Sequence, residues 1–124
     1  MQVNELNEGE KAQYSLDGKV LDIDVKDQGI SLDLAQEQED EEKTIDICLN
    51  KNGELVIGVD NWYIANITIP AAEYDFQDNG ETDEQGNIVY EKVKKPLNTD
   101  NVVLDLWALP NFIKKTNQDE GVVN

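Results

Sequence analysis

The stretch Thr44–Pro70 constrains the fold more than any other part of the chain, because it is the longest run dense in β-branched and aromatic residues. Apolar and polar residues alternate over Thr44–Leu49, as expected of a strand with one buried face. The Asn-Gly pair at positions 52 and 53 follows, and such a pair readily adopts the positive φ angles of a tight hairpin turn. The alternation resumes over Glu54–Val59 and again over Trp62–Ile69. We therefore predict a three-stranded meander, which is about the minimum for an independently stable sheet.

Similar alternation outside this stretch predicts further short strands. They are expected at Tyr14–Leu16, Lys19–Lys26, Ile30–Leu34, Tyr74–Phe76, Val89–Val93 and Val102–Leu109. The charged run Ala35–Lys43 suits a short solvated helix or a mobile loop, and Asn111–Lys115 suits a short helical turn. The sequence therefore predicts an all-β fold, a small antiparallel β-sandwich or barrel of about seven or eight short strands.

The length of 124 residues fits one β domain spanning residues 1–124, with an ordered part of about 12–113. The polar ends are expected to be mobile, with Met1–Lys11 as a loose arm or one short strand or turn, and Thr116–Asn124 as a tail. The inward positions of the strands predict the core, which comprises Leu21, Ile23, Leu32, Ile45, Ile47, Ile57, Ile67, Leu104 and Leu106.

Acidic side chains dominate the composition. The chain has 27 Asp and Glu residues against 10 Lys and Arg, which gives a formal net charge of −17. A field of this sign repels nucleic acids and anionic membranes, so neither is expected as a partner. It attracts basic proteins or cations, or simply keeps the chain soluble. All the basic residues are lysine and there is no histidine, so the bidentate anion-binding side chain and the commonest general base are missing.

The first residues, MQVNELNEGEK, contain neither a basic nor an apolar segment and therefore do not resemble a signal peptide. No apolar run approaches the roughly 20 residues that a membrane helix needs. The single cysteine, Cys48, cannot form an internal disulfide, and a reducing compartment is the default for such a chain. We therefore expect a protein that is cytoplasmic in the cell that produces it.

The loop Asp75–Gly86 partly matches a calcium-binding EF-hand loop, with acidic and amide side chains at several ligand positions. However, Gly86 stands where a bidentate glutamate is required, and no helices are expected on either side. A solvated hairpin tip is the favoured interpretation, and weak calcium binding is the alternative. We expect no tightly held metal ion and no cofactor.

Two further arrangements are candidates for catalysis. Asp22, Asp24 and Asp33 fall on one face of the first predicted hairpin, where two carboxylates would suit acid–base chemistry of the glycosidase type. In so acidic a chain some pair always lies at a suitable separation, so an ordinary polar sheet face is favoured. Cys48 has no histidine to activate it as a nucleophile and is expected to fill space on the second sheet face. We therefore predict that the protein is not an enzyme.

Three aromatic residues are the candidate interaction residues. Trp62 and Trp107 fall opposite the main apolar positions of their strands, and Tyr63 adjoins the first of them. Paired, the tryptophans would form a sugar-binding platform or a protein contact. The alternative is that they belong to a second buried face of a sandwich.

The segment Ile69–Leu109 carries a resemblance through IPAAEYDF, the spacer GETDEQGNIVYEKV and the closing KPLNTDNVVLDLWALP. It is similar to small acidic proteins of unassigned role that are encoded among late genes of bacterial phages and prophages. The resemblance implies a structural or accessory protein of the tail, baseplate or capsid surface, which assembles into a virion. It implies protein partners or self-assembly, and it assigns no functional residue.

An acidic inhibitor that mimics nucleic acid is the alternative function. Such a protein presents carboxylates at phosphate-like spacing to the basic groove of a DNA-binding host enzyme. The mimic requires an ordered, one-sided array, whereas here the acidic residues occur in every segment and are dense only over Glu37–Glu42. This spread favours the docking protein.

Overall fold

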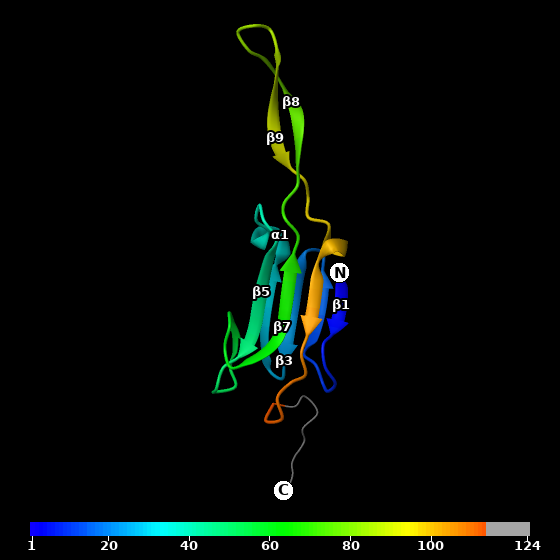
Figure 1. The fold of residues 1–124 in the computed structure, drawn as a ribbon, viewed down its shortest axis with the longest axis vertical. Coiled ribbons are helices and arrows are strands. Elements are labelled where there is room, and N and C mark those ends of the chain that lie inside the picture. The colour runs from blue at the N-terminus through cyan, green and yellow to red at the C-terminus, as the bar shows by residue number, and fades with distance from the viewer. Residues whose placement is uncertain (114–124) are drawn as a thin grey trace.

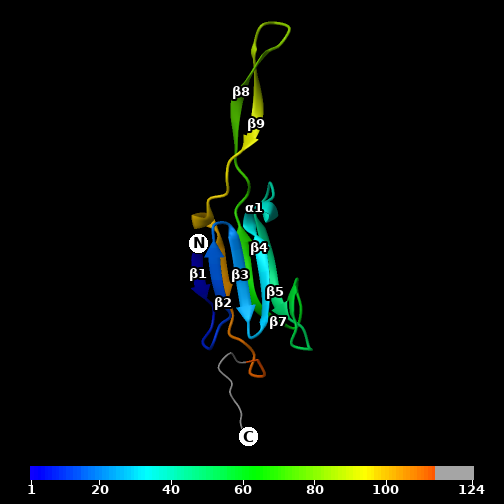
Figure 2. The ribbon, with the colours of Figure 1, turned by 180° about the vertical axis from the view of Figure 1, so that it is seen from behind.

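Two sheets packed face to face form the body of the protein, which a computed structural model describes over residues 1–113. The larger sheet has the strand order β1-β10-β7-β5-β6, and the smaller sheet has the order β2-β3-β4. A separate two-stranded sheet, β8-β9, rises from one end of the body (Figure 1). The predicted all-β class is confirmed, and the two layers are seen from opposite sides in Figures 1 and 2.

The strands are short, apart from β8 and β7. Their bounds are β1 Gln2–Glu5, β2 Gln13–Asp17, β3 Val20–Val25, β4 Gln28–Asp33, β5 Lys43–Leu49, β6 Leu55–Ile57, β7 Trp62–Ile69, β8 Tyr74–Thr82, β9 Ile88–Lys94 and β10 Val103–Leu106. One turn of α-helix, α1 (Leu34–Glu37), and one turn of 3-10 helix, η1 (Thr99–Asn101), complete the described structure.

The central hairpin forms where the Asn-Gly pair predicts it. Gly53 adopts a φ of 79°, and its N–H donates to the carbonyl of Asn50 at 3.0 Å. The side chain of Asn50 accepts hydrogen bonds from the N–H groups of Asn52 and Glu54, both at 2.9 Å. These bonds satisfy backbone donors that the turn would otherwise leave unpaired.

The N-terminal segment lies inside the fold, not outside it as the predicted boundary near residue 12 implies. It forms β1, which pairs in parallel with β10 from Gln2–Val103 to Glu5–Leu106. Of the alternatives considered, the short strand is therefore the one observed. This parallel pair is an exception to the predicted antiparallel sandwich, since the other strand pairs are antiparallel.

The hydrophobic core lies between the two sheets. All but one of the predicted core residues are buried, namely Leu21, Ile23, Leu32, Ile45, Ile47, Ile67, Leu104 and Leu106. The predicted burial of Ile57 is wrong, since its side chain is 60% exposed. It belongs to β6 at the edge of the larger sheet, and the strand ends at Ile57 rather than continuing to Val59. Alternation in the sequence marks an apolar face but does not show that another sheet covers it.

A bulge alters the faces of β7. Ile47 pairs with Ala65, but its neighbour Cys48 pairs with Tyr63, so Ile64 lies between the two pairs. Ile64 and Ala65 are both fully buried. Tyr63 was predicted to share the inward face of Ala65, and the extra residue turns it to the outer face instead.

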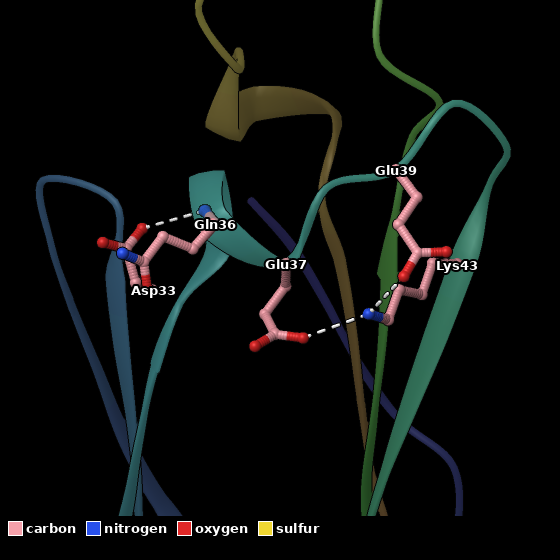
Figure 3. Close-up of polar contacts among 5 residues, drawn as sticks. All are labelled: Asp33, Gln36, Glu37, Glu39 and Lys43. Atoms are coloured by element: carbon pink, nitrogen blue, oxygen red, sulfur yellow. Dashed lines mark hydrogen bonds and ion pairs between the residues drawn. The ribbon is translucent and has the colours of Figure 1, made fainter.

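The charged run after β4 contains a one-turn helix followed by a loop, within the alternatives predicted. Asp33 caps α1, because its Oδ1 accepts hydrogen bonds from the N–H groups of Ala35 and Gln36 at 3.1 and 3.2 Å (Figure 3). After β10, Ile113 N–H donates to the carbonyl of Pro110 at 2.9 Å, which forms the expected turn. The rest of that predicted turn, Lys114 and Lys115, and the predicted tail Thr116–Asn124 lie outside the described residues.

No helix within residues 1–113 is long and apolar enough to cross a membrane.

Candidate interaction site

The β8–β9 hairpin projects from the body as an arm, which we define as residues 74–94 (Figures 1 and 2). Its two strands pair with each other from Tyr74–Lys94 to Thr82–Ile88. Asp83 organises the tip, because its side chain accepts from the N–H groups of Gln85 and Asn87 at 2.9 and 2.8 Å. These bonds favour the charged carboxylate and hold the pKa of Asp83 below its usual value.

One side of the arm is apolar and basic. Cross-strand partners share a face, and the pairs Phe76–Lys92 and Asp78–Tyr90 show which residues lie together. We call this side the arm face; it comprises Tyr74, Phe76, Asp78, Ile88, Tyr90, Lys92 and Lys94. Phe76 is 71% exposed, Tyr90 58% and Ile88 51%. Lys92 Nζ lies 4.1 Å from the centroid of the Tyr74 ring, a cation–π contact.

The base of the arm is tied to the loop that follows α1. The hydroxyl of Tyr74 donates to the carboxylate of Asp40, and this hydrogen bond raises the pKa of Tyr74. The N–H of Ala72 donates to the carbonyl of Glu39 at 2.8 Å. These two contacts join the arm and the segment just before it to the body, next to the start of β5.

A second feature is the incomplete edge of the larger sheet. β6 pairs with β5 only at Ile47–Leu49, so within residues 1–113 the half Lys43–Asp46 pairs on one side only, with β7. The last hydrogen bond on the open side runs from Gly58 N–H to the carbonyl of Asp46 at 2.8 Å. Backbone groups alternate between the two sides of a strand. The N–H and C=O of Thr44 therefore point toward the open side.

A pocket of about 380 Å³ adjoins this free half of β5. Leu32, Ile45 and the exposed side chains of Ile57 and Val59 supply its apolar lining, and the charged residues Glu37, Lys43 and Asp46 also line it. We call the half-strand Lys43–Asp46 together with this pocket the open edge. It combines unpaired backbone groups with an apolar surface, which are the two features that an added strand recognises.

Acidic side chains surround the end of the open edge nearest the arm. Lys43 is paired with two of them, at 3.1 Å to Glu37 and 2.9 Å to Glu39 (Figure 3). These hydrogen bonds, first from Glu39 and then from Glu37, raise the pKa of Lys43. Glu41 and Glu42 are exposed and take part in no ion pair recorded within residues 1–113. This end of the open edge is therefore negatively charged.

The aromatic residues predicted as contacts form two separate pairs at the end of the body opposite the arm. Tyr63 stacks on Trp107 with ring centroids 5.8 Å apart. Trp62 meets Phe112 edge-on at 4.8 Å. The two tryptophans were predicted to share the face opposite the core, but Trp62 pairs with the buried Leu49 and therefore lies on the core side of the sheet. They do not form the paired platform that was considered.

Trp107 is also held by a polar row across the outer face of the larger sheet. Its indole N–H donates to Oδ1 of Asn66 at 2.7 Å, and Nδ2 of Asn66 donates to Asp46 at 2.7 Å. On the other side, Asn4 donates to Asp105 at 2.8 Å. These residues stand opposite one another in four neighbouring strands, so the row links β1, β10, β7 and β5.

The residues considered for catalysis have structural surroundings. Asp22, Asp24 and Asp33 share the outer face of the smaller sheet, as predicted. Asp22 accepts a hydrogen bond from Ser31, and Asp33 caps α1. Cys48 is fully buried, and this burial raises the pKa of its thiol, an effect partly opposed by a backbone hydrogen bond involving Asp60.

The candidate calcium loop is part of the arm, not a compact loop. Its first residues belong to the extended strand β8, where Asp75 lies 3.6 Å from Lys95. Its middle residues form the tip around Asp83. Within residues 1–113, no three acidic, cysteine or histidine side chains gather closely enough to hold a metal ion.

The sequence predicted neither which strand edge stays open nor that the β8–β9 hairpin projects from the body. The alternation at Tyr74 and Phe76 marked a strand, but the sequence carries no signal that this strand stands clear of the body. Comparisons with protein-family models, curated proteins and solved structures found no match.

Proposed function

We propose that the protein is a non-enzymatic structural protein that works by docking, as a component or accessory of a phage or prophage particle such as its tail, baseplate or capsid surface. The observation that carries this proposal is the arm, a two-stranded sheet that stands clear of the body and exposes Phe76, Ile88 and Tyr90. The resemblance of Ile69–Leu109 to late phage proteins supports the same function, since that segment includes the whole arm.

The arm by itself lacks a third strand or a packed face within residues 1–113. An isolated two-stranded hairpin is marginally stable in water, and three strands or a packed face are needed to stabilise it. Covering apolar surface contributes roughly 25 cal/mol per Å², so a partner that covers the arm face stabilises both the arm and the complex. Exposed aromatic side chains of this kind are the usual anchors of protein interfaces. The arm is therefore the element that docks.

The aromatic end of the body is the second contact surface in this proposal. Trp62 and Tyr63 are 37% and 40% exposed, and Trp107 stacks beside Tyr63. This end and the arm lie at opposite ends of the long axis (Figure 1). A protein with contact surfaces at both ends is suited to bridge two components of an assembly.

The test is co-assembly in the cell that produces the protein. Affinity-tagged protein is purified from induced cells together with its partners, and the double variant Phe76→Ser/Tyr90→Ser is compared with the wild type. We expect the variant to retain less than about a tenth of a captured particle component, because it removes two central aromatic anchors. Tyr14→Ser is the matched control, since Tyr14 is a similarly accessible aromatic residue, 43% exposed, on β2 of the body.

Salt and DNA distinguish docking from nucleic-acid mimicry. Apolar docking is expected to weaken only moderately as salt is raised. Equal capture of the particle component by the wild type and by Phe76→Ser/Tyr90→Ser would contradict the proposal. So would a captured basic enzyme that dissociates in salt and is displaced by DNA.

A further inference from the structure

We propose that the arm docks on a second copy of this chain, with β9 of one copy adding antiparallel to the open edge of β5 in the other. This inference rests on the docking function proposed above and names the partner of the arm. It follows from three matches between surfaces that the same chain carries: unpaired backbone, apolar side chains and charge.

The first match is between two free strand edges. Within residues 1–113, β9 pairs only with β8, so its other side is unpaired. The half-strand Lys43–Asp46 of β5 pairs only with β7 over the same described range. A free strand edge is a template for another strand, because its N–H and C=O groups lack partners. Placing β9 beside β5 continues the larger sheet along the line where the short β6 ends.

The second match is between apolar side chains. The pocket runs along the free half-strand from Lys43 to Asp46, and the exposed side chains of Ile57 and Val59 line it beside Gly58, which bonds to Asp46. On β9, the exposed Ile88 and Tyr90 lie on the arm face at the start of the strand. Within residues 1–113 of a single copy, both surfaces are exposed. Each supplies the apolar surface that the other lacks.

The third match is charge, and it decides the direction of pairing. The end of the open edge nearest Lys43 carries the exposed carboxylates Glu41 and Glu42. On β9, Lys92 and Lys94 follow Tyr90 toward the end of the strand. Antiparallel addition brings these lysines to the acidic end while Ile88 and Tyr90 reach the pocket. Parallel addition would reverse both matches and place the lysines beside the exposed side chains of Ile57 and Val59, away from Glu41 and Glu42.

The second copy is favoured over a different partner for two reasons. The net charge of −17 repels a copy of the same chain, so self-association needs a local patch of opposite sign, and the arm face supplies one with two lysines against the single carboxylate of Asp78. In addition, the free half of β5 lies at the end of the body from which the arm rises (Figure 1). Two copies related by a twofold axis can therefore exchange arms and cover both edges at once.

A charge-swap experiment tests the inference. The arm variant is Lys92→Glu/Lys94→Glu, and the edge variant is Glu41→Lys/Glu42→Lys. Association is measured by analytical ultracentrifugation over a range of protein concentrations. We expect the wild type to dimerise and each variant alone to associate at least about tenfold more weakly, because like charges then face each other. An equimolar mixture of the two variants should recover association, since in the mixed dimer both contacts pair Glu with Lys.

Controls separate folding from association. The four substituted residues are exposed, so at a concentration where the wild type is monomeric each variant should keep the circular dichroism spectrum and thermal midpoint of the wild type. Tyr14→Ser should dimerise like the wild type, whereas Ile57→Lys should not, because it places a charge in the pocket wall.

Two results overturn the inference. One is a wild type that stays monomeric across the concentration range, and the other is a dimer that neither variant weakens. The capture experiment then decides between two cases. If the aromatic variant Phe76→Ser/Tyr90→Ser captures less of a particle component than the wild type does, the docking function stands and only the second copy is rejected. If that capture is also unaffected, the docking function fails as well.

Discussion

Tyr74, the first residue of β8, donates its phenolic hydrogen to the carboxylate of Asp40, 34 residues earlier in the chain. Together with the bond from Ala72 to Glu39, this contact links the arm to the loop between α1 and β5. It lies where the arm leaves the body, so it restricts the direction in which the arm points. The same loop borders the open edge. The base of the arm and the surface proposed to bind an arm of another copy therefore lie at the same end of the body.

Replacing Tyr74 by Phe is expected to loosen the arm without unfolding the body. The substitution removes the hydroxyl that bonds Asp40 and leaves the ring in place. We expect increased nanosecond motion for the amides of β8 and β9, measured by ¹⁵N relaxation, with unchanged values in β3 and β5. Unchanged relaxation in the arm would mean that the backbone bond of Ala72 holds it alone.

The same contact predicts a pH dependence. The carboxylate of Asp40 accepts a hydrogen bond from the Tyr74 hydroxyl, and this bond raises the pKa of Tyr74 above its ordinary value near 10. The stabilisation is therefore present below pH 10 and is lost as the pH rises through the higher pKa of the folded state. An ultraviolet titration should show that Tyr74 ionises above its ordinary value near pH 10. Asp40→Asn should bring the pKa of Tyr74 back toward its ordinary value. A titration unchanged by this substitution would show that Asp40 does not cause the shift.

Within the polar row on the outer face, substitution of Asn66 is expected to lower the free energy of unfolding the most. Asn66→Ala leaves the indole N–H of Trp107 and the carboxylate of Asp46 without their partner. We expect a loss of about 1–3 kcal/mol in the free energy of unfolding, measured with urea. Thr68→Ala, in the next row of the same strand, removes only a 3.3 Å contact with Thr44 and should cost less. Equal costs would show that the row contributes little.

Core truncations should separate the covered sheet from its open edge. Ile47→Ala and Leu104→Ala are each expected to cost about 2–5 kcal/mol of unfolding free energy, because both side chains are fully buried. Ile57→Ala should cost less than about 1 kcal/mol, since most of its side chain is already in water. The free energies of unfolding of the three variants are measured with urea at a concentration where the protein is monomeric. A large cost at Ile57 would mean that something covers it.

The thiol of Cys48 is expected to react slowly in the folded protein. Burial raises its pKa, so the reactive thiolate is scarce at neutral pH, and the side chain is closed off from reagents. A thiol-reactive dye should label the protein many times faster in denaturing urea than in buffer. Rapid labelling of the native protein would show that the region between β5 and the loop at Asp60 opens readily.

The sequence by itself determined the local structure of this protein. Alternation around the Asn50–Glu54 turn and over β3 and β4 predicted which residues form hairpins and which of their faces are apolar. These properties depend on the φ angles that residues near a turn can adopt and on the two-residue period of a strand, and both can be seen in a few neighbouring residues. The same reasoning predicted the burial of Leu21, Ile47 and Leu104.

Only the tertiary structure decided what lies against each face. Ile57 has the pattern of a core residue, but β6 lies at the edge of the larger sheet, and the described residues leave most of its side chain exposed. One extra residue in β7 separates the faces of Tyr63 and Ala65, and β1 finds its partner β10 about a hundred residues away in sequence. The arm has the alternation of an ordinary hairpin yet stands clear of both sheets. Each outcome depends on contacts between residues distant in sequence, and alternation within one strand carries no information about them.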